Sequence, residues 1–254
     1  MNSLRLLIDP PAGGAWNMAV DEVLLETAAS AGLATLRFYE WQVPTLSLGY
    51  FQAAADREQH ALSRDCPIVR RASGGWAIVH DRELTYSIAL PHSSPRSASA
   101  AELYDLFHET LVQTLATFGV AAAIYRPPAG QCGAAPAADA TSEPFLCFQR
   151  RSCGDIVCGG AKIVGSAQRR RKGAVLQHGS ILLARSTAAP ELPGIGEVAA
   201  VSIARADFSD RWLPALASRL GARPDPGELT DSEHEQVRHF ALQRYSAGDF
   251  LHRR

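Results

Sequence analysis

Hydrophobic positions recur at helical spacing in two long stretches of the chain and alternate with polar positions in a shorter one. An apolar residue every three or four positions predicts a helix over about 101–118, with Gly119 as its left-handed C-terminal residue. Similar spacing predicts a helix over about 16–31. Residues 84–90 alternate with a period of two, which is typical of a half-buried strand.

Short apolar runs bounded by Pro and Gly predict further strands. These runs lie at residues 4–8, 36–39, 45–48, 68–70 and 120–125. Two helical segments close the chain, one over about 210–220 and one that begins at the capping-box pattern Thr230-Asp231-Ser232-Glu233. Regular alternation of strand and helix is missing, so the pattern favours an α+β fold with a mixed sheet.

The composition is that of a folded globular protein without a strong charge imbalance. Of the 254 residues, 46% are hydrophobic and 20% are charged, and the formal net charge is −1. This length fits a single domain, residues 1–254, with a small helical C-terminal part from about residue 205. The near-zero net charge argues against nucleic acid or an anionic membrane as a partner. No apolar run approaches the roughly 20 residues that a membrane span needs.

Five cysteines, Cys66, Cys132, Cys147, Cys153 and Cys158, form an odd set without a recognisable secretory signal. Such a set argues against a disulfide framework and favours a reducing, cytoplasmic location. The spacing of the last three lacks the close CxxC pairing that is typical of structural zinc. We therefore predict no metal site.

The segment Arg70-Arg71-Ala72-Ser73-Gly74-Gly75 is the first candidate for chemistry. Adjacent arginines offer forked donors to a phosphate or carboxylate, and adjacent glycines let a ligand approach the backbone. A plain turn between two strands explains the glycines equally well. His80, which follows, is either a general base or substrate ligand, or a histidine packed at a strand end.

Two further candidates are single residues with competing interpretations. Cys147 stands between Leu146 and Phe148, and this local composition alone favours a small buried side chain over a nucleophile. Lys162 is flanked by Gly159-Gly160 and Gly165 and is either held at the mouth of a pocket or exposed in a turn, which is the commoner case.

Two longer segments carry weaker signals. The basic run 169–172 is most often a solvated face or a hairpin tip, and contact with an acidic partner is the alternative. The Pro-, Gly- and Ala-rich stretch 127–144 leads directly to Cys147 and is typical of a functional or disordered loop.

Taken in order, these motifs resemble the lipoate-protein ligase A and octanoyltransferase superfamily. The resemblance covers most of the chain, through Asn17-Met18-Ala19-Val20-Asp21-Glu22, Arg70 to Gly75 and on to His80, Glu83-Leu84-Thr85-Tyr86-Ser87, Lys162-Ile163-Val164-Gly165-Ser166-Ala167-Gln168 and Leu176-Gln177-His178-Gly179-Ser180-Ile181. It implies a mixed, mostly antiparallel central sheet flanked by helices, similar to the catalytic domain of biotin and lipoate ligases and of class II aminoacyl-tRNA synthetases.

Two branches of this superfamily differ in how the acyl group is activated. ATP-dependent ligases form a lipoyl adenylate and pass the group to a lysine of an acceptor protein. Ligase-like octanoyltransferases need no cofactor; they take octanoate from acyl carrier protein through a cysteine thioester and give it to a lipoyl-domain protein, such as the glycine-cleavage H protein. The chain resembles the second branch more closely, because Cys147 stands fifteen residues before Lys162 and Glu83-Leu84-Thr85-Tyr86-Ser87 is that branch's form of the strand. A non-catalytic acyl- or carrier-binding member of the fold is a third alternative.

The resemblance also implies roles for particular residues. Cys147 is expected to carry the acyl group, and Lys162 to favour the thiolate and polarise the acyl carbonyl. The basic run 169–172 is expected to steer an acidic carrier protein. The substrate is expected to contact Arg70, Arg71, Ser73, Gly74, Gly75, Trp76, His80, Gly165, Ser166, Ala167 and His178.

The chain departs from the superfamily at a few positions. Trp76 stands where a smaller or more polar residue is usual, and we expect it to shorten or redirect the acyl tunnel. Ala161 replaces a basic residue, and the run Phe148-Gln149-Arg150-Arg151-Ser152-Cys153 lacks the usual proline before its serine. These changes bear on the acyl chain, its donor and its acceptor rather than on the fold.

Overall fold

A computed structural model describes residues 3–97, 99–127 and 144–252 of the chain. Most of the loop predicted over 127–144, including Cys132, lies outside these ranges. Within them, no helix is both long enough and apolar enough to cross a membrane.

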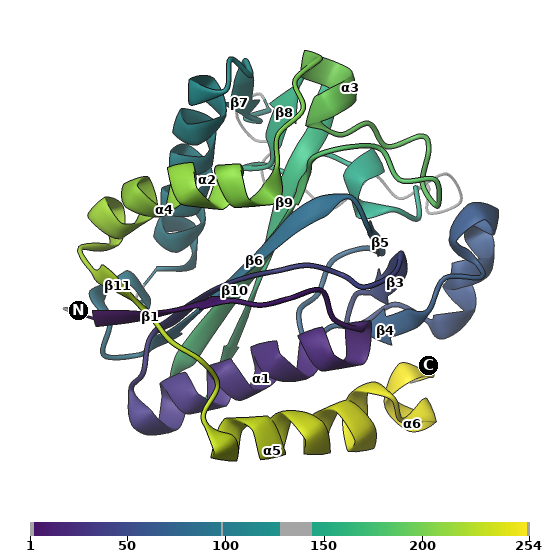
Figure 1. The fold of residues 1–254 in the computed structure, drawn as a ribbon. Coiled ribbons are helices and arrows are strands. Elements are labelled where there is room, and N and C mark those ends of the chain that lie inside the picture. The colour runs from purple at the N-terminus through teal and green to yellow at the C-terminus, as the bar shows by residue number, and fades with distance from the viewer. Residues whose placement is uncertain (1–2, 98, 128–143, 253–254) are drawn as a thin grey trace.

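A large, mostly antiparallel sheet runs through the molecule (Figure 1). Its described strands lie in the order β11-β1-β2-β6-β10-β9-β8-β7, in which β1 is parallel to both of its neighbours and the other pairs are antiparallel. In chain order the strands are β1 (Ser3–Ile8), β2 (Thr35–Tyr39), β6 (Glu83–Pro91), β7 (Ala122–Ile124), β8 (Ile156–Cys158), β9 (Ala161–Arg171), β10 (Ala174–Leu182) and β11 (Arg223–Pro226). The predicted α+β class with a mixed sheet is confirmed.

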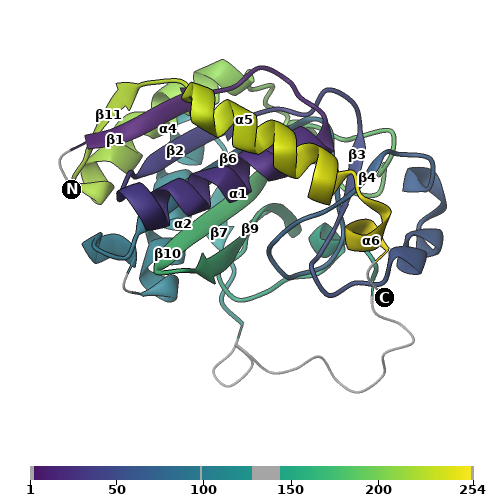
Figure 2. The ribbon, with the colours of Figure 1, turned by 90° about the horizontal axis from the view of Figure 1, so that it is seen from below.

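A second, smaller sheet lies at one end of the first (Figures 1 and 2). Its described strands are β4 (Ile68–Arg70), β3 (Thr45–Leu48) and β5 (Ile78–His80), with β3 in the middle. Two 3₁₀ turns, η1 (Ala54–Gln59) and η2 (Ala61–Ser63), connect β3 to β4. The segment between β4 and β5 is the predicted glycine-rich segment, so this small sheet fixes both of its ends.

Helices cover both faces of the large sheet (Figure 1). On one face lies α1 (Gly14–Ala31), with α5 (Asp231–Phe240) packed along it, as Figure 2 shows from below. On the other face α2 (Ala100–Thr117) packs against α4 (Arg205–Leu220). The shorter elements are η3 (Pro95–Ser97), η4 (Cys147–Gln149), α3 (Ile195–Ala199), the π-helical turn η5 (Ala241–Tyr245) and α6 (Gly248–Leu251).

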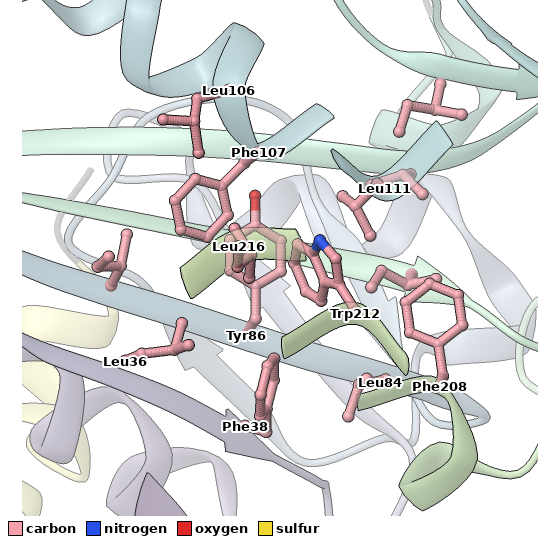
Figure 3. Packing of buried hydrophobic residues seen from close by; sticks show 14 of the residues in the cluster. Leu36, Phe38, Leu84, Tyr86, Leu106, Phe107, Leu111, Phe208, Trp212 and Leu216 are labelled. Atoms are coloured by element: carbon pink, nitrogen blue, oxygen red, sulfur yellow. The ribbon is translucent and has the colours of Figure 1, made fainter. Parts of the chain in front are cut away.

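The core between the sheet and the α2–α4 layer is built around Trp212 (Figure 3). The rings of Phe38, Tyr86, Phe107 and Phe208 surround its indole with centroid distances of 5.7, 5.0, 5.8 and 6.1 Å. The indole N–H donates to the hydroxyl of Thr110 at 2.9 Å, so burial leaves no polar atom of Trp212 unpaired. Aromatic side chains bury large apolar areas, and this cluster therefore ties α2 and α4 to the sheet.

Several local predictions hold in detail. Thr230 and Glu233 form the expected capping box: the Thr230 hydroxyl accepts from the Glu233 N–H at 3.2 Å, and the Glu233 carboxylate accepts from the Thr230 N–H at 2.9 Å. Gly119 has φ +76°, as expected of a helix C-terminus. Strand β11 was not predicted, because its four residues include two prolines and gain their structure from parallel pairing with β1.

The cysteine prediction needs one correction. Cys153 is disulfide-bonded, whereas Cys66, Cys147 and Cys158 are free. A disulfide depends on how folding brings two sulfur atoms together, and an odd count with irregular spacing does not reveal this.

Candidate functional site

A cavity of about 160 Å³ lies where the small sheet, the middle of β9 and β10 and the turn η4 meet. Both predicted catalytic residues line it, together with every predicted substrate-binding residue except Arg70 and Ser73. The predicted residues on its wall are Arg71, Gly74, Gly75, Trp76, His80, Cys147, Lys162, Gly165, Ser166, Ala167 and His178. Segments that are distant in sequence thus form one concave site.

Cys147 is placed on this wall by its apolar neighbours. Phe145, Leu146 and Phe148 are all buried in a hydrophobic cluster, while Cys147 is only half-buried. The Cys147 N–H donates to the carbonyl of Ala77 at 2.8 Å, which fixes the backbone beside the glycine-rich segment. The apolar residues on either side of Cys147 are therefore the buried ones. They anchor the segment in the core, while the thiol itself lies at the cavity.

Lys162 points at this thiol from β9. Its Nζ lies 3.5 Å from Cys147 Sγ and 2.8 Å from Asp155 Oδ2, and its side chain is only 3% exposed. Burial alone would lower the pKa of Lys162, but the charges of Cys147 and Asp155 and their hydrogen bonds outweigh burial and raise it. Lys162 is therefore a buried, charged ammonium rather than a solvated turn lysine.

Asp155 is a cavity residue that the sequence analysis missed. Its carboxylate accepts from the Ser152 N–H at 2.6 Å and from the Tyr104 hydroxyl at 3.3 Å, besides its ion pair with Lys162. Gly154 precedes it with φ +95°, and a side chain there would meet the Tyr104 ring at 2.7 Å. A lone Gly-Asp pair before a strand is too common to mark a site, so the sequence held no usable signal.

Arg71 holds the glycine-rich segment in shape. Its guanidinium donates to the carbonyls of Gly74, Trp76 and Ser47 at 2.8, 2.8 and 3.1 Å. Gly75 has φ +94°, and its carbonyl lies where a Cβ on Gly49 would be, at 1.8 Å. Burial lowers the pKa of Arg71 to about 10, with the charge of Cys147 opposing the shift, so Arg71 stays cationic at neutral pH. The segment is both a turn and a cavity wall.

Arg70 has a different place from the one predicted. It does not line the cavity; its guanidinium donates to the carbonyls of Gly49 and Gln52 at 2.9 and 2.6 Å, and to those of Phe250 and Leu251 at 3.0 and 2.7 Å. Arg70 thereby joins the loop after β3 to the C-terminal helix α6.

Ser73 and His178 form a buried chain behind the wall. The Ser73 hydroxyl lies 2.5 Å from His178 Nε2, and His178 Nδ1 lies 3.5 Å from the carboxylate of Asp21. Asp21 is itself paired with Arg37 at 3.0 Å, and although burial alone would raise the pKa of Asp21, the hydrogen bond to His178 and the charge of Arg37 lower it. Ser73 does not line the cavity, whereas His178 does.

His80 uses both ring nitrogens inside the protein. Its Nδ1 donates to the carboxylate of Glu83 at 2.7 Å, and its Nε2 lies 2.8 Å from the Ser47 hydroxyl. The ring stacks on Trp41 with a centroid distance of 4.0 Å. This geometry matches a packed histidine at a strand end that also forms part of the cavity wall.

Ser166 belongs to a hydrogen-bond chain with a defined direction. His108 donates through Nδ1 to the carbonyl of Gly154 at 2.7 Å, so its Nε2 must accept from the Ser166 hydroxyl, also at 2.7 Å. Burial lowers the pKa of His108 to about 4, which keeps the ring neutral. The Tyr86 hydroxyl then donates to Ser166 at 2.7 Å. The Ser166 hydroxyl proton is therefore committed to His108, and any further hydrogen bond to this hydroxyl is one that Ser166 accepts.

The basic run is largely engaged within the protein. Arg170 donates to the carbonyl of Ser97 at 2.7 Å, Arg171 pairs with Glu22 at 2.8 Å, and the Arg169 guanidinium lies 5.2 Å from the ring centroid of Tyr50. Lys172 and Gly173 both have positive φ and form the turn between β9 and β10. The hairpin-tip interpretation is confirmed.

Residues 14–190 match the family described as the lipoyl protein ligase A/B catalytic domain. The chain is 36% identical over 282 aligned positions to the octanoyltransferase LipM of Kyrpidia tusciae, and 30% identical over 287 to that of Halalkalibacterium halodurans; both comparisons span 100% of each chain. Its fold is similar to that of a bi-partite lipoate protein ligase from Thermoplasma acidophilum, solved in a study that includes its E2 lipoyl domain. The TM-score is 0.76, with 19% identity over 99% of this chain and 97% of the other.

Proposed function

Because the chain belongs to the lipoyl protein ligase A/B catalytic-domain family and is an acyltransferase, we propose that it moves an octanoyl group from acyl carrier protein to a lysine of a lipoyl-domain protein. The group travels as a thioester on Cys147. The observation that carries this proposal is the Lys162 ammonium, held 3.5 Å from Cys147 Sγ at the wall of a cavity.

The names of the relatives support the octanoyl group, and the Thermoplasma study supports a lipoyl domain as acceptor. Among lipoyl-domain proteins we propose the glycine-cleavage H protein. We also propose that residues 1–254 act as one cytoplasmic catalytic domain. Two contacts support a single domain: β11 pairs with β1, and α5 packs along α1, so the C-terminal part is bonded to the first strand and helix.

In the loading step, the Cys147 thiolate attacks the thioester carbonyl of the octanoyl carrier. A new C–S bond forms to Cys147, the C–S bond to the carrier breaks, and the carrier leaves as a thiolate that takes a proton from solvent. An ammonium beside the sulfur favours the nucleophilic thiolate over the thiol. The cationic Arg71 on the same wall acts in the same direction.

In the transfer step, the neutral ε-amine of the acceptor lysine attacks the thioester carbonyl of octanoyl-Cys147. A C–N bond forms, the C–S bond breaks, and the electron pair returns to Cys147 Sγ beside Lys162. The nitrogen loses its extra proton to solvent. Ser166 lines the cavity and can only accept a further hydrogen bond, so we assign Ser166 to orienting the N–H of the incoming amine.

The acyl chain occupies the apolar part of the cavity. Met18, Ile78, Phe148 and the indole of Trp76 line this part. The guanidinium of Arg150 covers that indole, with its carbon 3.5 Å from the ring centroid. Burial of each CH₂ group contributes roughly 0.8 kcal/mol, which is enough for the cavity to select a chain length.

The reaction needs no ATP, because a thioester is already an activated acyl group. The rival proposal, an ATP-dependent ligase, would use the arginines of the glycine-rich segment for an adenylate. The Arg70 guanidinium instead contacts backbone carbonyls of two loops. A non-catalytic binding protein would have no use for a buried lysine held against a cysteine.

Two parallel incubations test the proposal. One contains octanoyl-acyl carrier protein and an unmodified lipoyl-domain protein without ATP; the other contains free octanoate with ATP and Mg²⁺. We expect the acceptor to gain the mass of one octanoyl group in the first incubation only. Modification that requires ATP and free octanoate would identify a ligase. No modification in either incubation would favour the non-catalytic binding protein.

A further inference from the structure

Lys162 is shared between two acids. Its ammonium lies 2.8 Å from the carboxylate of Asp155 and 3.5 Å from the sulfur of Cys147. The side chains of Lys162 and Asp155 are each only 3% exposed, so water screens neither charge effectively. Asp155 is thus the nearer partner of the cation that activates the thiol.

The charge around Lys162 changes during the proposed reaction. In the proposed loading step, the cations Lys162 and Arg71 face two anions, the Asp155 carboxylate and the attacking Cys147 thiolate. Once Cys147 carries an acyl group, its sulfur is neutral and this anion is lost. A buried ammonium without an anion tends to release its proton, because desolvation penalises the charged form.

The other titratable groups near Lys162 do not replace this anion. His108 on α2 is neutral, because burial lowers its pKa to about 4. Tyr104, also on α2, is a neutral phenol, because burial and the charge of Asp155 raise its pKa. Arg71, on the glycine-rich segment, is a cation. Among the described groups that face Lys162, Asp155 alone is an anion in the acylated state.

We infer that Asp155 is a positioning residue that keeps Lys162 protonated and aimed at the sulfur while Cys147 carries the acyl group. This inference rests on the thioester relay proposed above. Its consequence is an asymmetry between the two half-reactions: loading has the thiolate itself to hold the ammonium, whereas transfer depends on Asp155. In the transfer step, Lys162 stabilises the electron pair that returns to Cys147 Sγ when the C–S bond breaks.

The carboxylate is built to hold this position. The Ser152 N–H and the Tyr104 hydroxyl both donate to it, and Gly154 adopts positive φ to bring the backbone against the Tyr104 ring. Asparagine in place of Asp155 keeps the size and can keep contacts to its neighbours, but removes the negative charge.

The first experiment separates the two half-reactions under single-turnover conditions. Loading is followed by intact mass after mixing with octanoyl-acyl carrier protein, and transfer by mixing the isolated octanoyl-enzyme with the lipoyl-domain protein. For Asp155→Asn we expect loading within about threefold of wild type, and transfer about 100-fold slower at pH 8, the scale of losing one transition-state donor. The deficit should shrink as pH falls, because Lys162 then regains its proton. Asp155→Glu should recover part of the transfer rate.

A matched control removes a buried carboxylate elsewhere. Glu233 is paired with Arg5 at 2.7 Å, and its side chain is 5% exposed, so Glu233→Gln also breaks a buried ion pair. It should leave both half-reactions unchanged. Equal slowing of loading and transfer in Asp155→Asn would show that Asp155 has a merely structural role. Unchanged transfer would show that Asp155 has no role in the reaction. Either result overturns the inference.

The second experiment reads the charge of Lys162 directly in the wild-type protein. The chain contains only two lysines, Lys162 and Lys172, so ¹³Cε-lysine labelling gives two resonances. Lys172 is 63% exposed and serves as the internal reference. After iodoacetamide makes the Cys147 sulfur neutral, the Lys162 resonance should keep its ammonium position wherever the exposed Lys172 reference keeps its own. In alkylated Asp155→Asn the Lys162 resonance should move to the free-amine position at a lower pH than the Lys172 resonance does.

The two experiments distinguish the failure of this inference from that of the proposed function. A wild-type protein that never forms an octanoyl-enzyme overturns the relay and the inference with it. A wild-type protein that loads and transfers, but whose Lys162 loses its proton near neutral pH after alkylation, overturns the inference alone. This second readout needs no variant, so it holds even if Asp155→Asn fails to fold.

Discussion

Two buried ion pairs of similar length lie in different parts of the molecule. Arg5 on β1 meets Glu233 on α5 at 2.7 Å, and Lys162 on β9 meets Asp155 at 2.8 Å. The first pair is bidentate, and Glu233 accepts additionally from the Thr230 N–H at 2.9 Å. The second shares its ammonium with a thiol and lines a cavity.

The difference shows how one type of contact serves two purposes. A guanidinium that donates to both oxygens of a carboxylate fixes geometry, and here it fastens helix α5 to strand β1. A compact ammonium with a second, ionisable partner can respond when that partner changes charge. The Arg5–Glu233 pair should therefore govern stability alone, and the Lys162–Asp155 pair should govern chemistry.

Removal of the Cys147 thiol should have the largest effect. Cys147→Ala deletes the ionisable partner of Lys162, and we expect transfer to the lipoyl-domain protein to fall by about 10⁴-fold or more, because the proposed relay passes the acyl chain through this sulfur. Quantitative mass spectrometry of the acceptor checks this. Cys66→Ala is the control, since Cys66 is free and does not line the cavity. A Cys147→Ala protein with more than a tenth of wild-type activity would contradict the account.

Neutralising the cation should slow the transfer step for the Lys162–Asp155 pair and not for the Arg5–Glu233 pair. Lys162→Gln should lower the transfer rate by about 10²–10³-fold, because the returning sulfur charge loses its counter-ion. Arg5→Gln should leave that rate within about twofold, because Arg5 lies outside the cavity wall. Both variants should lose stability. Single-turnover kinetics measure the transfer rate, and denaturant unfolding measures the stability of each variant. Equal transfer rates in the two variants would contradict the difference between the two ion pairs.

The Arg5–Glu233 pair should make the free energy of unfolding depend on pH in the acidic range. Burial alone would raise the pKa of Glu233, but the hydrogen bonds and charge of Arg5 outweigh it and lower the pKa from 4.5 to about 2. A carboxyl group whose pKa is lowered by folding stabilises the folded protein at every pH above its ordinary pKa. This stabilisation is lost as pH falls from about 4.5 towards 2. Glu233→Gln should cost about 3 kcal/mol at pH 7 and flatten the dependence in that window. Urea unfolding at several pH values checks this, and a parallel loss in both proteins would refute it.

The smallest predicted effect concerns the wall beside the reactive pair. Trp76→Ala removes an indole that lines the cavity under Arg150, so two further CH₂ groups gain room. At roughly 0.8 kcal/mol per buried CH₂, preference for decanoyl over octanoyl carrier should rise by about tenfold. Competition between the two carriers, read by acceptor mass, tests this. An unchanged ratio would show that Trp76 does not limit the chain.

The sequence predicted the elements whose signals are local. The helices α1 and α2 and the capping box at Thr230 follow from spacing and side-chain chemistry within a few residues. Strand β11 escaped prediction because its order comes from pairing with β1, more than 200 positions away.

The site was predictable only in part, for the same reason. The motif order implied Cys147 and Lys162, and the structure places them 3.5 Å apart. Arg70 carried the same expectation as Arg71, yet its donors meet carbonyls at residues 250 and 251, a contact that no local pattern reveals. Asp155 had no motif, because its importance arises only when folding sets it beside Lys162.

The proposed relay depends on an octanoyl thioester at Cys147, which intact-mass measurement detects. Wild type and Cys147→Ala are incubated with octanoyl-acyl carrier protein without ATP, and the mass of each protein is measured before and after hydroxylamine. The account predicts one octanoyl adduct on the wild type, removed by hydroxylamine, and none on the variant. A hydroxylamine-sensitive adduct on Cys147→Ala, or no adduct on the wild type, would contradict it.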